Sequence, residues 1–302
     1  MPDKMEKIGH SIIQHGNENR RVYLMKLDKR DLNEIVPKIE QLARKKRYGK
    51  IFCKIPEWAR ERFENHHYRL KASIPQFYQG KEDVCFMSKF LNPKRMLVTT
   101  ENKKKIRANL KLARVKAPAA LSKISLRYQI RKLNESQAEA LSHLYEKVYD
   151  SYPFPITEAG YLRQTMRSHI DYFGVFINRT LVAASSSEKD INASNAEMTD
   201  FATLPRYRGK GLATALLVRM ENEMKNQNIQ TLYTIARALS AGMNITFARC
   251  GYHYSGTLIN NTQIFGHIES MNVWYKHIDH QDSQTTGHDI SSNTPHSSGF
   301  LF

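Results

Sequence analysis

Cysteine is scarce in this chain of 302 residues. The three cysteines, Cys53, Cys85 and Cys250, form no Cys-x-x-Cys pair. An odd number of widely spaced cysteines argues against a disulfide framework and against a structural zinc site. We therefore expect reduced thiols, a cytoplasmic location and no bound metal.

Long apolar runs are missing as well. No stretch of about 18 apolar residues occurs anywhere in the chain, which is the length a membrane-spanning helix needs. Residues 1–20 mix charged and apolar side chains and lack the apolar centre of a signal peptide. We expect neither a membrane span nor a secretion signal.

Acidic residues are outnumbered, since 46 Lys and Arg oppose 29 Asp and Glu for a net charge of +17. About half of this excess lies between Asn92 and Lys123, where ten basic residues oppose one acid, Glu101. Such a run is typical of a solvated linker or a surface helix, and a polyanion-binding patch is the alternative. Charge alone identifies no partner, and a nucleic-acid partner is not favoured.

The overall composition and length are those of a folded protein with about two domains, which we expect to be of the α/β class. Apolar residues make up 41% and charged residues 25%, near the averages for soluble globular proteins. Hydrophobic periodicity predicts alternating strands and helices in both halves. The predicted parts are an N-terminal extension (1–20), an α/β domain (21–91), a basic linker (92–125), a second α/β domain (126–278) and a disordered tail (279–302).

The two domains share an order of predicted elements. The first reads βαβαββ, and the second reads βααβββαβαββ, which ends in the same order. The aromatic pair Phe63 and Tyr68 is spaced like the pair Phe247 and Tyr252. We interpret the first domain as a degenerate half of the second fold that packs on it or forms a homodimer interface. Coincidence of a common βαβ order is the alternative.

The strongest chemical signal is a glycine-containing loop between an apolar strand and a long amphipathic helix. Its sequence is Arg206-Tyr207-Arg208-Gly209-Lys210-Gly211-Leu212-Ala213. Glycines allow a ligand to approach the backbone closely, and the N-terminus of the following helix attracts anions. The loop therefore predicts a pyrophosphate site, although it is neither a P-loop nor a Rossmann G-x-G-x-x-G loop.

The spacing Arg206-x-x-Gly209-x-Gly211 resembles the [Q/R]-x-x-G-x-[G/A] motif of the GNAT family of N-acetyltransferases. The order of elements over residues 126–278 is also similar to that family. The resemblance implies a GNAT fold that binds acetyl-CoA by its pyrophosphate at this loop. The implied cofactor contacts are Phe201, Ala202, Thr203, Arg206, Arg208, Gly209, Lys210, Gly211, Leu212, Ala213, Asn244 and Phe247.

Four further segments resemble the beta-lysine N-acetyltransferases within that family, namely residues 197–203, 233–238, 242–244 and 269–275. The resemblance implies acetylation of the N6 amine of beta-lysine, 3,6-diaminohexanoate, to give a compatible solute used in osmoprotection. The loop at residues 152–155 fits too, which makes Tyr152 and Phe154 candidate substrate contacts. The alternatives are another small amine or a protein lysine as acceptor.

Acetyl transfer to an amine needs a proton acceptor, because an alkylammonium with a pKa near 10.4 is rarely nucleophilic at neutral pH. Glu197 lies on the strand before the glycine loop, where several members of the family place a catalytic glutamate. Asp200 is the alternative base. Strict alternation would place Glu197 and Phe201 on one face of the strand and Asp200 on the other.

In the family, a tyrosine often protonates the departing CoA thiolate, and Phe247 occupies that position here. Either the thiolate leaves unassisted, or Tyr252, Tyr254 or Tyr233 donates a proton. We expect a backbone N–H of the strand at residues 201–203 to stabilise the oxyanion.

Beta-lysine carries one carboxylate and two amines, so its recognition needs a basic residue and an acid besides the base. Arg237, at the end of a predicted strand, and Glu269, at the start of the last strand pair, are the candidates. A CoA phosphate contact or a surface ion pair is the alternative for Arg237. A solvated turn is the alternative for Glu269.

Overall fold

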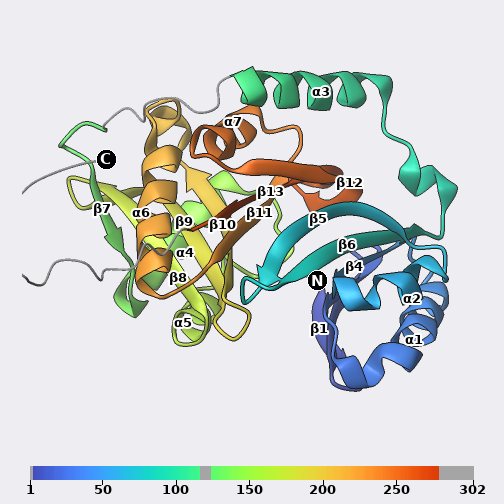
Figure 1. Cartoon of the computed structure of the whole chain (residues 1–302). Helices are drawn as coiled ribbons and strands as arrows, with labels where there is room; N and C mark the ends of the chain where they lie inside the picture. The colour runs from blue at the N-terminus through green and yellow to red at the C-terminus, as the bar shows by residue number, and fades with distance from the viewer. Residues whose placement is uncertain (1–2, 116–123, 279–302) are drawn as a thin grey trace, which may run out of the picture.

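The computed structural model describes residues 3–115 and 124–278, which form two mixed β-sheets with helices packed on them (Figure 1). The predicted α/β class is confirmed. The predicted tail at residues 279–302 and the predicted connection at residues 117–120 lie outside the described residues.

The first half begins at Lys4 and ends with the sixth strand at Phe90. Its strands and helices are β1 (Lys4–Ile8), β2 (Ser11–Gly16), β3 (Arg21–Lys26), α1 (Leu32–Lys45), β4 (Lys50–Pro56), α2 (Arg60–Glu64), β5 (Arg69–Tyr78) and β6 (Glu82–Phe90). Helix α1 forms as predicted because Ile35, Ile39 and Ala43 recur on one face and are fully buried. The strands lie in the order β1-β2-β3-β4-β6-β5.

Strands β1 and β2 were not predicted from the sequence, where residues 1–20 were predicted to form an extension. Charged side chains interrupt the apolar pattern of β1, and Lys4, Glu6 and Lys7 face outward or lie half-buried. Such side chains are typical of an edge strand, where they discourage pairing with another chain. The predicted extension is therefore an integral part of the first sheet.

The second half contains seven strands and four helices among the described residues. They are β7 (Gln129–Lys132), α4 (Ala138–Val148), α5 (Ala159–Met166), β8 (Ile170–Ile177), β9 (Thr180–Asp190), β10 (Asn195–Thr203), α6 (Leu212–Asn226), β11 (Thr231–Arg237), α7 (Ala241–Arg249), β12 (His253–Ile264) and β13 (His267–His277). The predicted capping box of Asn134 and Gln137 precedes α4. The strands lie in the order β12-β13-β11-β10-β9-β8-β7.

The two sheets repeat one topology. Strands β3 and β4 pair in parallel and β4 pairs with β6 antiparallel, just as β10 pairs with β11 and β11 with β13. Phe63 and Tyr68 meet edge-on with ring centroids 5.2 Å apart, and Phe247 and Tyr252 do so at 5.0 Å. The predicted correspondence of element order is confirmed. Both halves have a short 3-10 helix after the first strand of the parallel pair, at Lys29–Asp31 and at Pro205–Tyr207, but only in the second half does a glycine loop follow it.

One apolar core joins the two halves. Its members include Tyr23, Phe52 and Phe86 from the first sheet and Tyr233, Met271 and Val273 from the second. Strands β5 and β12 also touch, and Ser255 Oγ lies 2.9 Å from the backbone nitrogen of Ser73. A Cβ at Gly256 would lie 2.0 Å from the Lys71 carbonyl oxygen, so this approach requires glycine.

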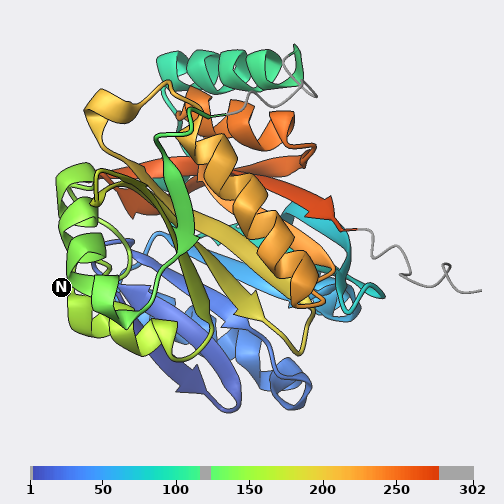
Figure 2. The same cartoon turned by 90° about the vertical axis from the view of Figure 1, so that its left-hand side faces the viewer.

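The second sheet has differently covered faces (Figure 2). Helices α6 and α7 pack on one face. On the opposite face, α4 and α5 cover β8 and β9, and the first sheet covers β11 and β13. Strand β10 therefore lies beneath α6 and α7 on one face and, on the other, between the area covered by α4 and α5 and the area covered by the first sheet.

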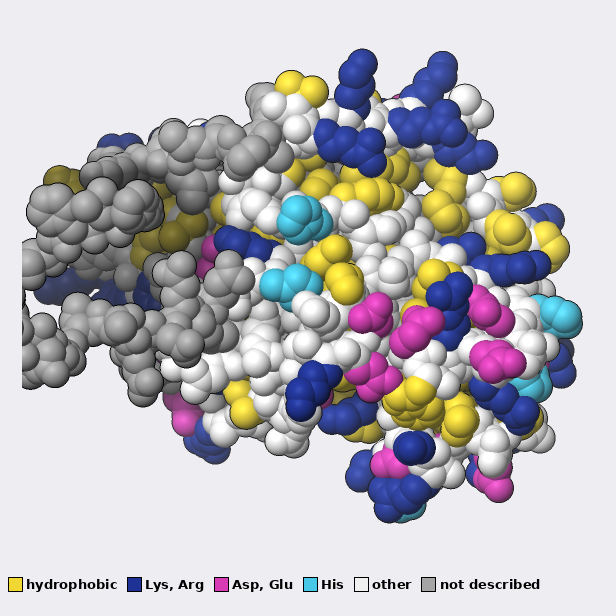
Figure 3. Space-filling view, viewed as in Figure 1, with side chains coloured by type: hydrophobic (Ala, Val, Ile, Leu, Met, Phe, Trp, Pro, Cys, Tyr) yellow, Lys and Arg dark blue, Asp and Glu magenta, His cyan; other side chains and the backbone are white. Residues whose placement is uncertain are grey.

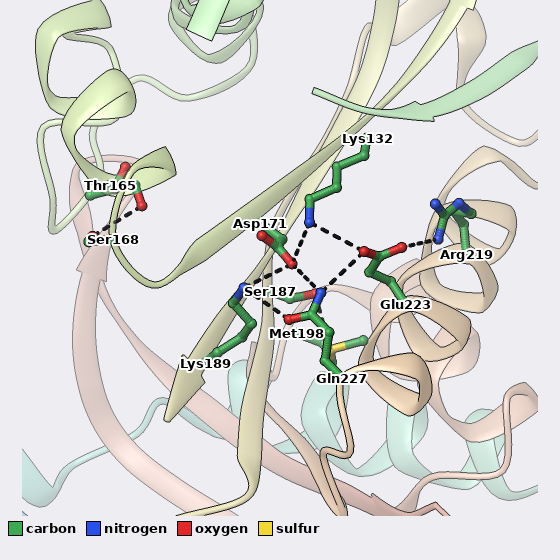
Figure 4. Close-up of polar contacts among 10 residues, drawn as sticks. All are labelled: Lys132, Thr165, Ser168, Asp171, Ser187, Lys189, Met198, Arg219, Glu223 and Gln227. Atoms are coloured by element: carbon green, nitrogen blue, oxygen red, sulfur yellow. Dashed lines mark hydrogen bonds and ion pairs between the residues drawn. The ribbon is translucent and has the colours of Figure 1, made fainter. Parts of the chain in front are cut away.

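A partly buried charge network anchors the C-terminal end of α6 (Figure 4). Asp171 on β8 lies 3.0 Å from both Lys132 Nζ and Lys189 Nζ and accepts from Gln227 Nε2 at 2.8 Å. Glu223 on α6 lies 3.3 Å from Lys132 Nζ. Burial opposes ionisation of Asp171, but the three donors outweigh it and lower the pKa of the carboxyl.

Much of the basic segment forms a surface helix, α3 (Thr100–Val115). Its own residues Ile106 and Ala113 are buried on the inner side, and Asn109 Nδ2 donates to the Ala238 carbonyl oxygen at 3.0 Å. The basic side chains are exposed along its outer side (Figure 3): Lys103, Lys104, Lys105, Arg107, Lys111 and Arg114. A surface helix is one of the forms expected for this segment.

Candidate active site

The candidate site lies where β10 and β11 separate. The two strands pair in parallel over three residues, and the last pair is Glu197 with Tyr233. A β-bulge then interrupts β10 between Thr199 and Ala202, and Asp200 adopts a φ of 53°. The bulge and the divergence open the sheet at this point.

A cleft of about 560 Å³ occupies the divergence. One end is lined by the glycine loop and the start of α6, with Arg208, Gly209, Gly211, Leu212 and Ala213. The middle is lined by Phe201, Thr203, Ile235, Ala236 and Phe247. The other end is lined by Tyr149, Tyr152, Asp200, Arg237 and Phe265.

The glycine loop provides an anion site. Gly209 and Gly211 have φ values of 74° and 75°, a conformation that favours glycine, and Gly211 immediately precedes α6. Among the described residues, no side chain caps the N-terminus of α6, and its first turn contains no acid. The first backbone N–H groups of the helix and the nearby Arg208 can therefore bind a pyrophosphate.

The structure favours a different register for the motif. Arg206 does not line the cleft, and its guanidinium lies 4.9 Å from the ring centroid of Tyr207. Arg208 does line it, and the spacing Arg208-x-x-Gly211-x-Ala213 fits the same pattern. The consecutive Arg-x-Arg-Gly-x-Gly residues allow both registers, so the sequence could not distinguish them.

Glu197 lies at the last paired position before the strands diverge. Its carboxylate lies near the Tyr233 hydroxyl, near Glu188, its cross-strand partner on β9, and near Lys54 of β4. Burial and then Glu188 raise the pKa of Glu197 to about 7, while Lys54 and Tyr233 oppose the rise. A carboxylate with such a pKa can accept a proton near neutral pH. Glu197 adjoins the cleft but does not line it.

Asp200 lines the cleft, and the prediction of strict alternation along β10 was wrong. The bulge brings Asp200 to the sheet face that also carries Glu197, where it accepts from the Tyr152 hydroxyl and from Ser186 Oγ, the latter at 2.5 Å. Phe201 instead packs toward α7, 5.6 Å from the Phe247 ring. Burial raises the pKa of Asp200, although the hydroxyl donors oppose this.

Aromatic side chains form a wall at the end of the cleft away from the glycine loop, which we call the acceptor end. This wall was only partly predicted from the sequence. The Tyr149 hydroxyl donates to the Phe201 carbonyl oxygen at 2.8 Å, and the rings of Tyr149 and Phe265 lie 5.5 Å apart. Phe265 is at the tip of the β12–β13 hairpin, whose two-residue turn, Phe265-Gly266, has positive φ at both positions. The Phe-Gly pair within a polar stretch was the signal that could have identified this turn.

Arg237 and Glu269 form one unit. Glu269 accepts two hydrogen bonds from the Arg237 guanidinium, at 2.9 and 2.6 Å, and the guanidinium lies 4.2 Å from the Phe265 ring centroid. Glu269 is buried and does not line the cleft, whereas Arg237 does. Glu269 therefore orients Arg237.

Several predicted site residues lie outside the cleft. Tyr252 is buried beside Phe247, and burial followed by Glu221 raises the pKa of its hydroxyl. Asn244 is fully buried and uses both ends of its amide in hydrogen bonds within the fold. The other predicted residues that do not line the cleft are Phe154, Glu197, Ala202, Arg206, Lys210 and Glu269. The alternative proton donors Tyr233 and Tyr254 do not line it either.

Within residues 3–115 and 124–278, no group of three or more His, Cys, Asp or Glu side chains is arranged to hold a metal ion. In the same ranges, no helix combines the length and apolar character needed to cross a bilayer.

Comparison with known proteins identifies the family. The model of the acetyltransferase (GNAT) family matches residues 136–252. The chain is 39% identical to the beta-lysine N(6)-acetyltransferase of Methanococcus maripaludis, over 91% of this chain and 98% of that protein. Identity is 28% to N-acetyltransferase YodP of Bacillus subtilis, over 89% and 96%, and 29% to the beta-lysine N(6)-acetyltransferase of Methanosarcina mazei, over 80% and 96%. The chain therefore belongs to the GNAT acetyltransferase family and is an acetyl-CoA-dependent N-acetyltransferase.

Proposed function

We propose that the enzyme acetylates the N6 amine of beta-lysine. One observation carries this proposal: a single cleft joins an anion-binding glycine loop to an acceptor end that presents both Arg237 and Asp200. A guanidinium suits the carboxylate of an amino acid, and a carboxylate suits its ammonium groups. Two relatives named beta-lysine N(6)-acetyltransferase support this acceptor.

In this proposal the CoA pyrophosphate binds the N–H groups between Gly209 and the first turn of α6, with Arg208 beside them. Phe201, Thr203 and Phe247 line the path toward the divergence of the strands. The bound co-substrate supplies an electrophilic thioester carbonyl. A backbone N–H of the bulged stretch of β10 stabilises the oxyanion that forms on it.

The two carboxylates of β10 have separate roles in the proposed reaction. Asp200, held by two hydroxyl donors in the cleft wall, binds the acceptor ammonium. Glu197, which adjoins the cleft and whose pKa of about 7 matches the task, receives the proton through a bridging water as the amine attacks. The CoA thiolate leaves without an acid, because a thiol pKa near 8.5 makes it a modest base.

The net charge of the product also fits the proposed role. Acetylation removes the charge of the N6 amine, which leaves one ammonium and one carboxylate on the molecule. Such a net neutral, highly soluble product suits the role of a compatible solute in the cytoplasm, and we include this role in the proposal.

The test is an acceptor comparison with purified enzyme and acetyl-CoA. Free thiol release is measured with beta-lysine, alpha-lysine, spermidine and a lysine-containing peptide, and the acetylated nitrogen is located by NMR. We expect the highest kcat/KM with beta-lysine and acetylation at N6. A higher kcat/KM with spermidine or the peptide, or acetylation at the C3 amine, would contradict the proposed acceptor.

A further inference from the structure

Lys54 reaches the catalytic centre from the first half of the molecule. It lies half-buried on β4, and its side chain reaches Tyr233, a member of the core shared by the two sheets. Its Nζ donates to the Tyr233 hydroxyl oxygen at 3.1 Å and lies 5.5 Å from the centroid of that ring. A residue of the half without a glycine loop thus contacts the strand that borders the cleft.

Tyr233 connects Lys54 to Glu197. An ammonium group can only donate hydrogen bonds, so the Tyr233 oxygen must accept from Lys54. This leaves the Tyr233 O–H free to donate to the neighbouring Glu197 carboxylate, and this hydroxyl lowers the pKa of that carboxyl. Because Tyr233 and Glu197 are paired across β10 and β11, the ladder fixes this contact.

The other groups around Glu197 disfavour its ionised form. Glu188 on β9 is directly opposite and Asp200 follows on β10, whereas the buried Tyr23 of β3 stays neutral because burial and Glu197 raise the pKa of its hydroxyl. Like charges placed opposite one another across strands repel. Lys54 is a cation that acts on this carboxylate, and it opposes that repulsion.

We propose that Lys54 is a positioning residue for acetyl transfer: through Tyr233 it keeps the Glu197 carboxylate ionised and oriented to accept the amine proton. The inference rests on the proposed function, which makes Glu197 the base. It gives the first half of the molecule a part in the chemistry.

The test compares pH profiles of kcat/KM for beta-lysine in wild type, Lys54→Met and Lys54→Arg. Loss of the cation should move the midpoint of the acidic limb of Lys54→Met upward by about one pH unit. The rate at pH 7 should fall by about fivefold, since the ionised fraction drops from about one half to about one tenth, and should approach the wild-type rate at high pH. Lys54→Arg should restore the midpoint, and the acetyl-CoA affinity of both variants should equal that of wild type in calorimetry.

Lys26→Met is the matched control. It also removes a lysine that links the halves, but Lys26 pairs with Asp190 at the surface, at 3.1 Å. Its acidic limb should coincide with that of wild type. A limb that moves as far as in Lys54→Met would assign the effect to a weakened interface and overturn the inference.

A Lys54→Met profile with the wild-type midpoint would also overturn it, whether or not the rate is uniformly lower. If Lys54→Met does not fold, Tyr233→Phe removes only the linking hydroxyl and must move the midpoint upward. An unmoved midpoint in Tyr233→Phe contradicts the inference.

Glu197→Gln distinguishes failure of the proposed function from failure of this inference. Wild-type activity in Glu197→Gln refutes the proposed base, whereas lost activity with an unmoved Lys54→Met midpoint refutes only the role of Lys54.

Discussion

Two carboxylates three residues apart on β10 have different surroundings. Asp200 accepts from the hydroxyls of Tyr152 and Ser186, which hold it in one position in the cleft wall. Glu197 lies among other acids and has a pKa of about 7. Differences of this kind assign separate tasks to paired carboxylates in many enzymes.

At the glycine loop, Gly209→Glu should abolish acetyl-CoA binding. The substitution places a negative side chain where phosphates bind and forces a non-glycine residue to adopt a φ of 74°. Calorimetric titration with CoA is the measurement. The control is Gly160→Ala on α5, where a Cβ meets no atom within 4 Å and which lies outside the cleft. CoA affinity within about twofold of wild type in Gly209→Glu would contradict the assigned phosphate site.

Arg237→Gln should raise KM for beta-lysine by about 10- to 100-fold and change kcat little, because a ground-state carboxylate contact is lost. The comparison acceptor is 1,4-diaminopentane, which is beta-lysine without its carboxylate. Its KM should not change in the variant, since Arg237 has no carboxylate to bind. An equal rise of KM for both acceptors would show that Arg237 acts by shaping the cleft.

At the scale of elements, the regular helices were predictable and the irregular strands were not. Helix α6 has the predicted bounds, Leu212–Asn226, because its apolar spacing and preceding glycine are local signals. The bulge at Asp200 could not be predicted, since it depends on pairing with β9. The long β12–β13 hairpin was predicted as two shorter strands, because polar residues near Asn260 and Asn261 interrupt its pattern.

The candidate site, like the fold, was predictable only in part. The glycine loop, Asp200, Arg237 and Phe247 were identified from sequence and line one cleft. Tyr149 was missed because a tyrosine near the end of a helix carries no chemical signal by itself. The orienting role of Glu269 depends on a contact across two strands, which spacing along the chain does not reveal.

The network at the end of α6 should contribute measurably to stability. Asp171→Asn leaves two lysines without their shared counter-charge, and we expect a loss of about 2 kcal/mol in the free energy of unfolding at pH 7. The folded-state pKa of Asp171 is lowered, so its contribution is complete above its unfolded pKa of about 4 and disappears as pH falls.

Urea denaturation at pH 7 and at pH 3 is the measurement, and the difference between wild type and Asp171→Asn should shrink at pH 3. Glu139→Gln, in an exposed pair with Arg163, is the control and should change stability by less than about 0.5 kcal/mol. A difference that grows on acidification would contradict the assigned pKa direction.

At the scale of the whole molecule, the shared core should make the two halves unfold together. Trp274 is buried in the second half and reports its unfolding by fluorescence in a Trp58→Phe variant. Cys53 and Cys85 are buried in the first half and report its unfolding by thiol labelling read by mass spectrometry. Both probes should give one denaturant midpoint.

Gly256→Val should lower both midpoints together, because a side chain cannot fit against the Lys71 carbonyl where β5 meets β12. Gly242→Ala, where a Cβ meets no atom within 4 Å, is the control. Separate midpoints for the two probes would show that the halves are independent domains.

The central claim is that acetyl transfer occurs where β10 and β11 diverge, with Glu197 as the proton acceptor. The most direct measurement is the pH dependence of kcat/KM for beta-lysine in wild type, Glu197→Gln and Asp200→Asn. We predict that wild type has an acidic limb near pH 7, and that Glu197→Gln lacks this limb and is slower by about 10²- to 10⁴-fold while binding acetyl-CoA normally. Near wild-type turnover and an unchanged limb in Glu197→Gln, together with lost turnover in Asp200→Asn, would contradict the claim.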